Sequence, residues 1–144
     1  MERCFNNLIF LSALLALSGC STVSCMWPWE KTHVSLRNEI GTDVSLNIHC
    51  KSRDDDLGVH TLAYNQTYSF AFHKVPIIKP TYFKCSMDWW DNSNRVKISG
   101  VFDLFEVARD YLYCEKHCDR VAKCDAVYTF DKENHLFVLY RWPR

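Results

Sequence analysis

Residues 44–60 have the sequence VSLNIHCKSRDDDLGVH. The first half alternates strictly, with apolar side chains at Val44, Leu46, Ile48 and Cys50 and polar side chains between them. A period of two residues predicts a β-strand with one buried face and one solvent-facing face. The charged block at residues 51–56 cannot be buried unpaired, so we predict an exposed acidic connection there, which turns into the next strand with the help of Gly58.

Other segments alternate in the same way. Their apolar positions are Val34 and Leu36; Tyr68, Phe70 and Phe72; Phe83, Cys85, Met87 and Trp89; Val96, Ile98, Phe102 and Leu104; and Leu136, Val138, Tyr140 and Trp142. Residues 60–64 are a further short candidate, whereas Pro76 and Pro80 predict a connection or a sheet edge. Residues 105–113 allow a helical turn but show no sustained 3.6-residue period. This pattern predicts the all-β class, as a small antiparallel β-sandwich of seven or eight short strands.

The stretch at residues 44–60 also resembles a family signature. His49-Cys50-Lys51-Ser52, followed by Asp54-Asp55-Asp56-Leu57-Gly58 and His60, is similar to the plant self-incompatibility S1 family, whose members are also called S-protein homologues. Further similar segments are residues 68–72, 81–89 and 102–105, and Arg109-Asp110 before Cys114, so the resemblance extends from Val34 to Trp142. It implies a small β-sandwich and an extracellular signalling protein. The named case is the pistil determinant of self-incompatibility, which a receptor on the pollen surface recognises before self pollen is rejected.

The length and charge of the chain restrict the classes of function. A chain of 144 residues with 48% apolar and 15% aromatic residues is typical of one folded domain, which we place at residues 25–144. The 17 basic and 17 acidic residues balance, so no net positive field attracts nucleic acid or an anionic membrane. We therefore expect that the protein does not bind nucleic acid and does not insert stably into a membrane.

Residues 1–24 are typical of a signal peptide. A short apolar core, residues 8–17, follows Arg3, and small residues offer cleavage points between residues 19 and 25. Ten such residues are too few for a membrane-spanning helix, which needs about 20. Leu17-Ser18-Gly19-Cys20 also resembles a bacterial lipoprotein signal with Cys20 as the lipidated residue, but the plant family resemblance favours a secreted, extracellular protein.

Cysteine usage agrees with export. The disulfide candidates in the predicted domain are Cys50, Cys85, Cys114, Cys118 and Cys124. Five is an odd number, so either Cys25 joins them, or one thiol stays free or pairs between chains. The family mostly has a C-x-x-C pair and a later Gly-Pro-Cys, and this chain departs from both, which leaves the connectivity open. A zinc site made by His117 and the last three cysteines is the alternative.

Asn65-Gln66-Thr67 is an Asn-x-Thr sequon in a predicted turn, and Asn65 is therefore a candidate glycosylation site.

No set of acid, base and nucleophile can be assembled from the sequence. His49 and Cys50 are neighbours in a predicted strand and point to opposite faces, so they are no catalytic pair. Residues 54–58, DDDLG, lack the spacing of a calcium loop. Of Trp89 and Trp90, alternation buries one and exposes the other. We expect no enzyme, no cofactor and no metal.

The sequence and the resemblance together favour a secreted ligand recognised by a cell-surface receptor, in self-incompatibility or related cell–cell communication. Exposed loops are the natural contacts, and the candidate residues are Arg53, Asp54, Asp55 and Asp56 in one loop and Asp91 and Asn92 in another. The alternative function is a secreted inhibitor or defence protein that acts on a protease or a microbe.

Overall fold

The computed structural model of the chain describes residues 31–73, 81–114 and 116–143. The predicted signal peptide, Cys25 and the connection that contains Pro76 and Pro80 lie outside the described residues.

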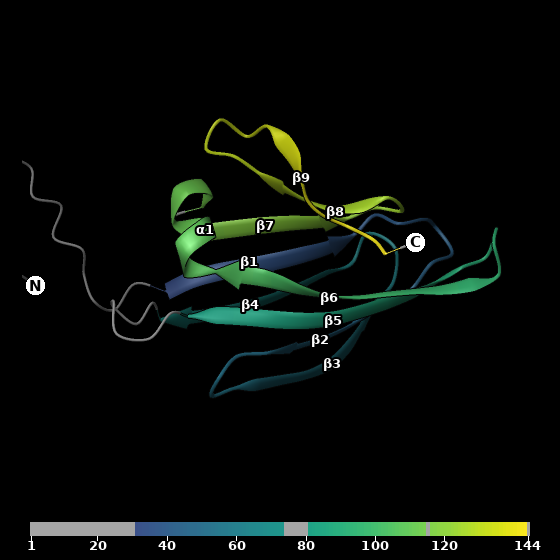
Figure 1. Cartoon of the computed structure of the whole chain (residues 1–144), viewed down its shortest axis with the longest axis horizontal. Coiled ribbons are helices and arrows are strands. Elements are labelled where there is room, and N and C mark those ends of the chain that lie inside the picture. Colours follow the sequence, from purple (N-terminus) through teal and green to yellow (C-terminus); the bar gives the residue numbers. More distant parts are fainter. Residues whose placement is uncertain (1–30, 74–80, 115, 144) are drawn as a thin grey trace, which may run out of the picture.

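Two packed β-sheets and one short helix form the described part of the chain. The elements are β1 Lys31–Asn38, β2 Leu46–Lys51, β3 Asp56–Leu62, β4 Thr67–His73, β5 Tyr82–Asp91, β6 Val96–Glu106, α1 Val107–Tyr113, β7 His117–Ala122, β8 Ala126–Phe130 and β9 Leu136–Arg141. One sheet has the strand order β4-β1-β7-β8-β9 and the other β3-β2-β5-β6 (Figure 1). The predicted all-β fold is confirmed, with nine strands in the described part of the chain where seven or eight were expected.

The inward side chains of the two sheets form the core. Leu46, Ile48 and Cys50 of β2 are 1% exposed or less, and the alternating residues of β5 from Phe83 to Trp89 are 6% exposed or less. Trp90, the next residue, is 52% exposed. The period-two pattern therefore predicts correctly which faces of these central strands are buried.

One pair of neighbouring strands is parallel, a detail that the predicted antiparallel sandwich does not include. β1 pairs with β4 antiparallel but with β7 in parallel, with His33 opposite His117. Parallel neighbours need a long crossover, and here the chain completes the second sheet and α1 before β7 returns beside β1.

β7 and β8 are strands that the sequence analysis did not identify. The inward side chain in the middle of β7 is Arg120, which is only 1% exposed. A charged residue at a buried position removes the apolar alternation on which the prediction of a strand depends. β8 is only five residues long, and Thr129 is buried in it beside Arg120.

The predicted inner face of β9 is partly wrong. Leu136 and Val138 are 41% and 36% exposed, because they belong to the outer face of an edge strand. The pairing register shifts between Val127 and Tyr128, so the inward parity changes along β9. Past this shift Tyr140 does face the core, and its ring packs 5.3 Å from that of Phe102.

Helix α1 lies at the end of the sandwich where β6 ends and β7 begins (Figure 1). Its buried residue is Asp110, which accepts a 2.9 Å hydrogen bond from the backbone N–H of Glu106. Because the buried side is a carboxylate, the sequence shows no apolar stripe of helical period. No helix in the described ranges is long and apolar enough to cross a membrane.

Candidate functional site

The β2–β3 turn carries the acidic block of the sequence. Ser52 organises the turn, because its Oγ accepts hydrogen bonds from the backbone N–H groups of Asp54 and Asp55, at 3.3 and 2.9 Å. The backbone N–H of Ser52 in turn donates to the carbonyl of Asp55, at 2.8 Å. These bonds hold the turn in one conformation without using the side chains at its tip.

Asp56 has a different role from its acidic neighbours. It is the first residue of β3, and its carboxylate accepts a 2.9 Å hydrogen bond from the N–H of Gly58 and contacts His49 Nε2 at 2.6 Å and Lys51 Nζ at 3.0 Å. The hydrogen bond from Gly58, then those from His49 and Lys51, hold the pKa of Asp56 well below its ordinary value. Gly58 itself has φ of +76°, which favours glycine. Much of the signature from His49 to Gly58 therefore shapes the turn.

Arg53, Asp54 and Asp55 are the exposed tip of this turn. No hydrogen bond or ion pair of these three side chains is found among the residues that the structure describes. Of the four candidate contacts predicted in this loop, these three are available to a partner, whereas Asp56 is occupied within the turn.

The β5–β6 turn, which contains the other two candidates, is built in a similar way. Asp91 accepts hydrogen bonds from the backbone N–H groups of Ser93 and Asn94 and from Asn94 Nδ2. The bonds from Asn94, aided by Ser93, lower the pKa of Asp91. Asp91 is thus occupied, whereas Asn92 is exposed, like the rest of the turn from Ser93 to Arg95, and the ring of Trp90 before it is 52% exposed.

The two turns lie at opposite ends of one sheet. Leu46 at the start of β2 pairs with Trp89, and Lys51 at its end pairs with Lys84. The β2–β3 turn is therefore beyond Lys84, and the β5–β6 turn is beyond Trp89, at the other end of the molecule (Figure 1). The two groups of candidate residues do not form one contact surface.

Asn65 lies in the turn between β3 and β4, at the same end of the sheet as the β5–β6 turn, because Leu62 pairs with Leu46. It has φ of 64°, and its backbone N–H donates to the carbonyl of Asn38 at 2.7 Å. Its side chain is exposed, as a glycosylated residue requires.

Four of the five disulfide candidates are paired in the structure. Cys50 joins Cys85, directly opposite it on β5, and Cys114 joins Cys118 across the junction of α1 and β7. Cys124 is exposed and has no disulfide partner among the described residues. The paired sulfurs are not thiolates, so they are not available to the alternative zinc site, and the described residues contain no group of three or more metal-ligating side chains.

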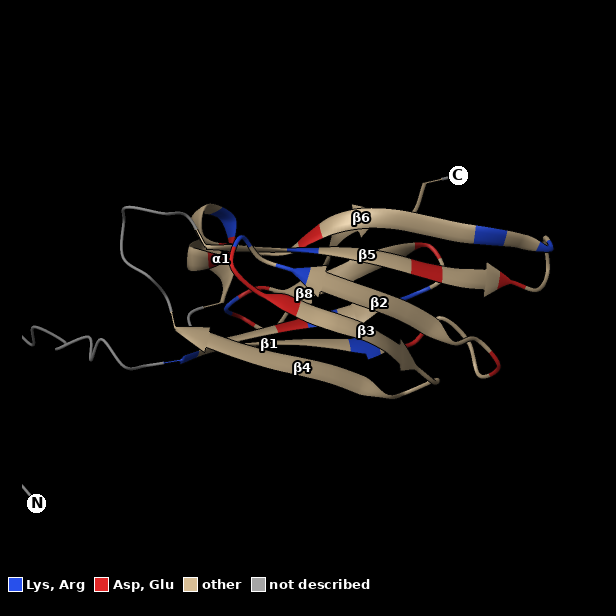
Figure 2. Cartoon of the chain, turned by 90° about the horizontal axis from the view of Figure 1, so that it is seen from below, with Lys and Arg blue, Asp and Glu red and all other residues tan. Residues whose placement is uncertain are grey.

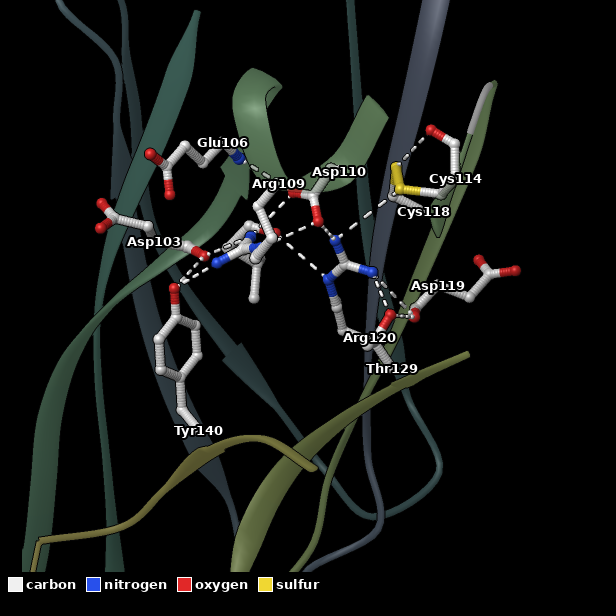
Figure 3. Close-up of polar contacts among 11 residues, drawn as sticks. Asp103, Glu106, Arg109, Asp110, Cys114, Cys118, Asp119, Arg120, Thr129 and Tyr140 are labelled. Carbon is white, nitrogen blue, oxygen red and sulfur yellow. Dashed lines mark hydrogen bonds and ion pairs between the residues drawn. A yellow bond between two sulfur atoms is a disulfide. The ribbon is translucent and has the colours of Figure 1, made fainter. Parts of the chain in front are cut away.

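A buried charge cluster lies between α1 and the ends of both sheets (Figure 3). Asp110 lies between two guanidinium groups: its carboxylate accepts hydrogen bonds from Nε and Nη2 of Arg109, at 2.9 and 2.8 Å, and forms a 2.9 Å ion pair with Arg120. Both Asp110 and Arg120 are 1% exposed. Burial lowers the pKa of Arg120 and Asp110 opposes this, whereas the bonds to Asp110 outweigh burial and raise the pKa of Arg109.

The same two guanidinium groups, one on α1 and one on β7, form hydrogen bonds with three further strands. Arg120 donates to the carbonyl of Leu104 on β6, at 3.2 Å, and to the hydroxyl of Thr129 on β8. Arg109 donates to the carbonyl of Asp103 on β6 and to the hydroxyl of Tyr140 on β9. Arg120 Nη2 also lies 3.9 Å from Cys114 Sγ. Sequence patterns do not predict this cluster, whose signal in the sequence is the Arg109-Asp110 pair of the family resemblance. Because Asp110 and Arg120 are buried and their bonds join the helix to the strands, we assign the cluster a structural role.

A surface cleft of about 650 Å³ opens where the β8–β9 hairpin diverges from β7. Asp119 and His117 of β7, Tyr113 of α1, and Phe130 and Asn134 of the hairpin contribute to its lining. None of the predicted contact residues lines it. Ser35 and Arg37 of β1 and Thr67 of β4 also line the cleft. Sequence patterns do not predict the cleft, because five segments that are distant in the sequence form it.

Comparisons with known proteins agree with this architecture. The family model described as plant self-incompatibility protein S1 matches residues 33–142, in agreement with the resemblance from Val34 to Trp142. S-protein homolog 6 of Arabidopsis thaliana is 34% identical over 143 residues, covering 94% of this chain and 97% of the relative. S-protein homolog 3 of Arabidopsis thaliana is 32% identical over 139 residues, covering 93% and 87%.

A solved structure has the same fold. It is described as that of SPH (self-incompatibility protein homologue) proteins, a widespread family of small, highly stable, secreted proteins from plants. Its TM-score is 0.59 at 19% identity, over 80% of this chain and 96% of the other. The sandwich, the extent of the family match and these relatives lead to one conclusion: the chain belongs to the plant self-incompatibility protein S1 family.

Proposed function

We propose that this protein is exported and acts as an extracellular signalling ligand that a cell-surface receptor recognises. Its family membership supports export, since the related proteins of known structure are described as secreted. No acid, base and nucleophile set was found in the sequence, which favours recognition over catalysis.

The observation that carries the proposal is the tip of the β2–β3 turn. Arg53, Asp54 and Asp55 present one positive and two negative charges to solvent, and the turn beneath them is held by Ser52 and Asp56. In Figure 2 the ribbon that connects β2 to β3 is red along the acidic residues of this turn, at one end of the domain. A turn that is already ordered loses little conformational entropy on binding, so its charges are ready for a complementary partner. The complementary receptor surface would carry two basic residues opposite the carboxylates and one acidic residue opposite Arg53.

The experiment is binding of the labelled, secreted protein to the surface of plant cells that respond to it. We expect Asp54→Ala with Asp55→Ala to weaken this binding at least tenfold, with an unchanged melting temperature. The matched control is Glu133→Gln, which removes another exposed carboxylate, in the β8–β9 turn, and should leave binding unchanged. Asn92→Ala tests the opposite end of the sheet.

Three results distinguish the outcomes. Loss of binding by the Asp54 and Asp55 variant on an intact fold supports the proposal. Loss only with Asn92→Ala moves the receptor contact to the β5–β6 turn. The absence of any saturable cell-surface binding, together with inhibition of a protease or of microbial growth, would replace the ligand proposal with the inhibitor or defence function.

A further inference from the structure

β4 is an edge strand whose outer backbone groups have no partner in the described ranges. It pairs with β1 only, over seven residues in uninterrupted register. The backbone N–H of Asn38 donates to the carbonyl of Gln66, while those of His33 and Glu39 donate towards β7, to Lys116 and Ala122. The direction of the backbone hydrogen bonds alternates from one residue of a strand to the next. The even-numbered residues of β1 therefore form their backbone hydrogen bonds with even-numbered residues of β4.

It follows that the odd-numbered residues of β4, namely Thr67, Ser69, Ala71 and His73, direct their N–H and C=O groups away from the sheet. These unused groups form a template for one more strand. Figure 2 shows β4 along the lower border of the domain, with no described strand beyond it.

The inward side chains of β4 are aromatic and incompletely covered. Tyr68, Phe70 and Phe72 form a ladder, with ring centroids 5.9 and 6.2 Å apart, and all three are only partly buried. Partial exposure of rings on the core side arises because no strand flanks them at the edge. An added strand with apolar residues at alternate positions would cover them.

The other sheet edges carry features that oppose pairing. Register shifts interrupt the pairing of β3, β6 and β9. Charged residues also occur on each of them, such as Asp56 on β3, Lys97 on β6 and Arg141 on β9. Bulges and charges are the usual protection of edge strands. The sequence of β4, TYSFAFH, contains no Asp, Glu, Lys, Arg or Pro, and its pairing with β1 has no register shift. Figure 2 accordingly draws β4 without a charged segment.

We propose that β4 pairs with β4 of a second copy of this chain, antiparallel and about a two-fold axis at Phe70. In this register Ser69 is opposite Ala71 of the second copy and Thr67 is opposite its His73, so all the outward-bonding residues meet one another and form about eight hydrogen bonds. Phe70 faces Phe70, and Tyr68 faces Phe72, which are favourable aromatic cross-strand pairs. No like charges meet across the axis, so the strand is complementary to itself.

The size of this contact sets its strength. Seven residues at about 3.3 Å each give a ladder about 23 Å long, which buries less than the roughly 1,200 Å² of a stable interface. We therefore expect a reversible dimer with a dissociation constant on the order of 10 μM, at the weak end of the range for protein interfaces.

The test is sedimentation velocity of the secreted protein from about 1 to 200 μM. Ser69→Pro removes an outward N–H and leaves the bonds to β1 intact, and proline is tolerated in edge strands. We expect the unchanged protein to shift from monomer to dimer, Ser69→Pro to stay monomeric with at least tenfold weaker association, and the matched control Ser69→Ala to dimerise normally. Far-UV circular dichroism verifies that each variant is folded.

A second measurement fixes the register and does not depend on the proline variant. With Cys124→Ser in the background, Phe70→Cys places two cysteines opposite each other across the axis and should form a disulfide-linked dimer under mild oxidation. Phe72→Cys faces Tyr68 of the second copy and should not. A monomer throughout the concentration range, dimerisation of folded Ser69→Pro, or equal cross-linking of the two cysteine variants would overturn the proposal.

Discussion

Asp110 is buried, and its negative charge lies between the positive charges of Arg109 and Arg120. It is paired with Arg109 and Arg120, and it also accepts the hydrogen bond of Glu106 that precedes α1. Since Arg120 is buried, its charge depends on Asp110 for compensation. Removing one partner of a buried pair is far more costly than the net value of the pair itself, because an uncompensated charge stays behind.

We predict that Asp110→Asn lowers the free energy of unfolding by about 3–5 kcal/mol. Urea titration followed by tryptophan fluorescence measures this difference. Asp54→Asn, which makes the same chemical change at the exposed turn tip, should alter stability by less than about 0.5 kcal/mol. An equal, small effect of both variants would show that the cluster does not depend on this carboxylate.

Asp56 gives a prediction about pH. Its pKa is lowered in the folded protein, by Gly58 first and then by His49 and Lys51, so its carboxylate favours folding wherever it is ionised in both states. This contribution is complete above the ordinary aspartate pKa of about 3.9 and is lost as the pH falls below it. The difference in urea midpoint between the unchanged protein and Asp56→Asn should therefore be greater at pH 7 than at pH 2. A difference that is independent of pH would contradict this assignment.

At the level of single strands, Gly100 shows why β6 needs a glycine inside it. A Cβ at this position would collide with the ring of Phe102, two residues further along the strand. That ring is already held by Tyr140 and Trp142, at 5.3 and 5.2 Å between centroids. The close approach of Phe102 to the backbone explains the absence of a side chain at residue 100.

Gly100→Ala should therefore destabilise the protein by about 1–3 kcal/mol, the usual cost of overpacking a core. Thermal unfolding monitored by near-UV circular dichroism is the suitable measurement, because displaced aromatic rings change that signal. Ser99→Ala, at the neighbouring position on the opposite face, is the control and should have little effect. Unchanged stability of Gly100→Ala would mean that the Phe102 ring moves freely.

Strands with one apolar face could be predicted from the sequence, and the others could not. In β2, β4 and β5 apolar and polar side chains alternate, because one face of each strand packs against the opposite sheet. β7 could not be predicted because the charged side chain of Arg120 occupies a buried position in it. Its place beside β1 depends on pairing between residues 84 positions apart, which no local sequence pattern contains. The acidic stretch is correctly predicted to be a turn. Which of its carboxylates form hydrogen bonds within the turn, as Asp56 does and Asp55 does not among the described residues, depends on side-chain geometry.

At the scale of the whole molecule, the two disulfides restrict the unfolded chain to different degrees. Cys50 and Cys85 are separated by 35 residues, and Cys114 and Cys118 by four. The loss of loop-closure entropy predicts about 4 kcal/mol of stabilisation for the long loop and about 2 kcal/mol for the short one. The first disulfide joins two central strands of one sheet, whereas the second joins only α1 to β7.

We expect Cys50→Ala with Cys85→Ala to lower the free energy of unfolding more than Cys114→Ala with Cys118→Ala, by about 2 kcal/mol. Urea unfolding of the two double variants, each compared with the unchanged protein under non-reducing conditions, measures the difference. The opposite order would show that local contacts of the short disulfide, such as that with Arg120, outweigh chain entropy.

The parallel pairing of β1 with β7 also affects when the fold can be completed. β1 is made first among the described strands, yet the strand on one of its sides is made some 84 residues later. At a synthesis rate of about 5–20 residues per second, β1 waits roughly 4–17 seconds for that neighbour. During this interval three of the five strands in the sheet of Val34 and Leu36, namely β7, β8 and β9, have not yet been made. The nascent chain is therefore most vulnerable to misassembly and to chaperone capture in the window before β7 emerges.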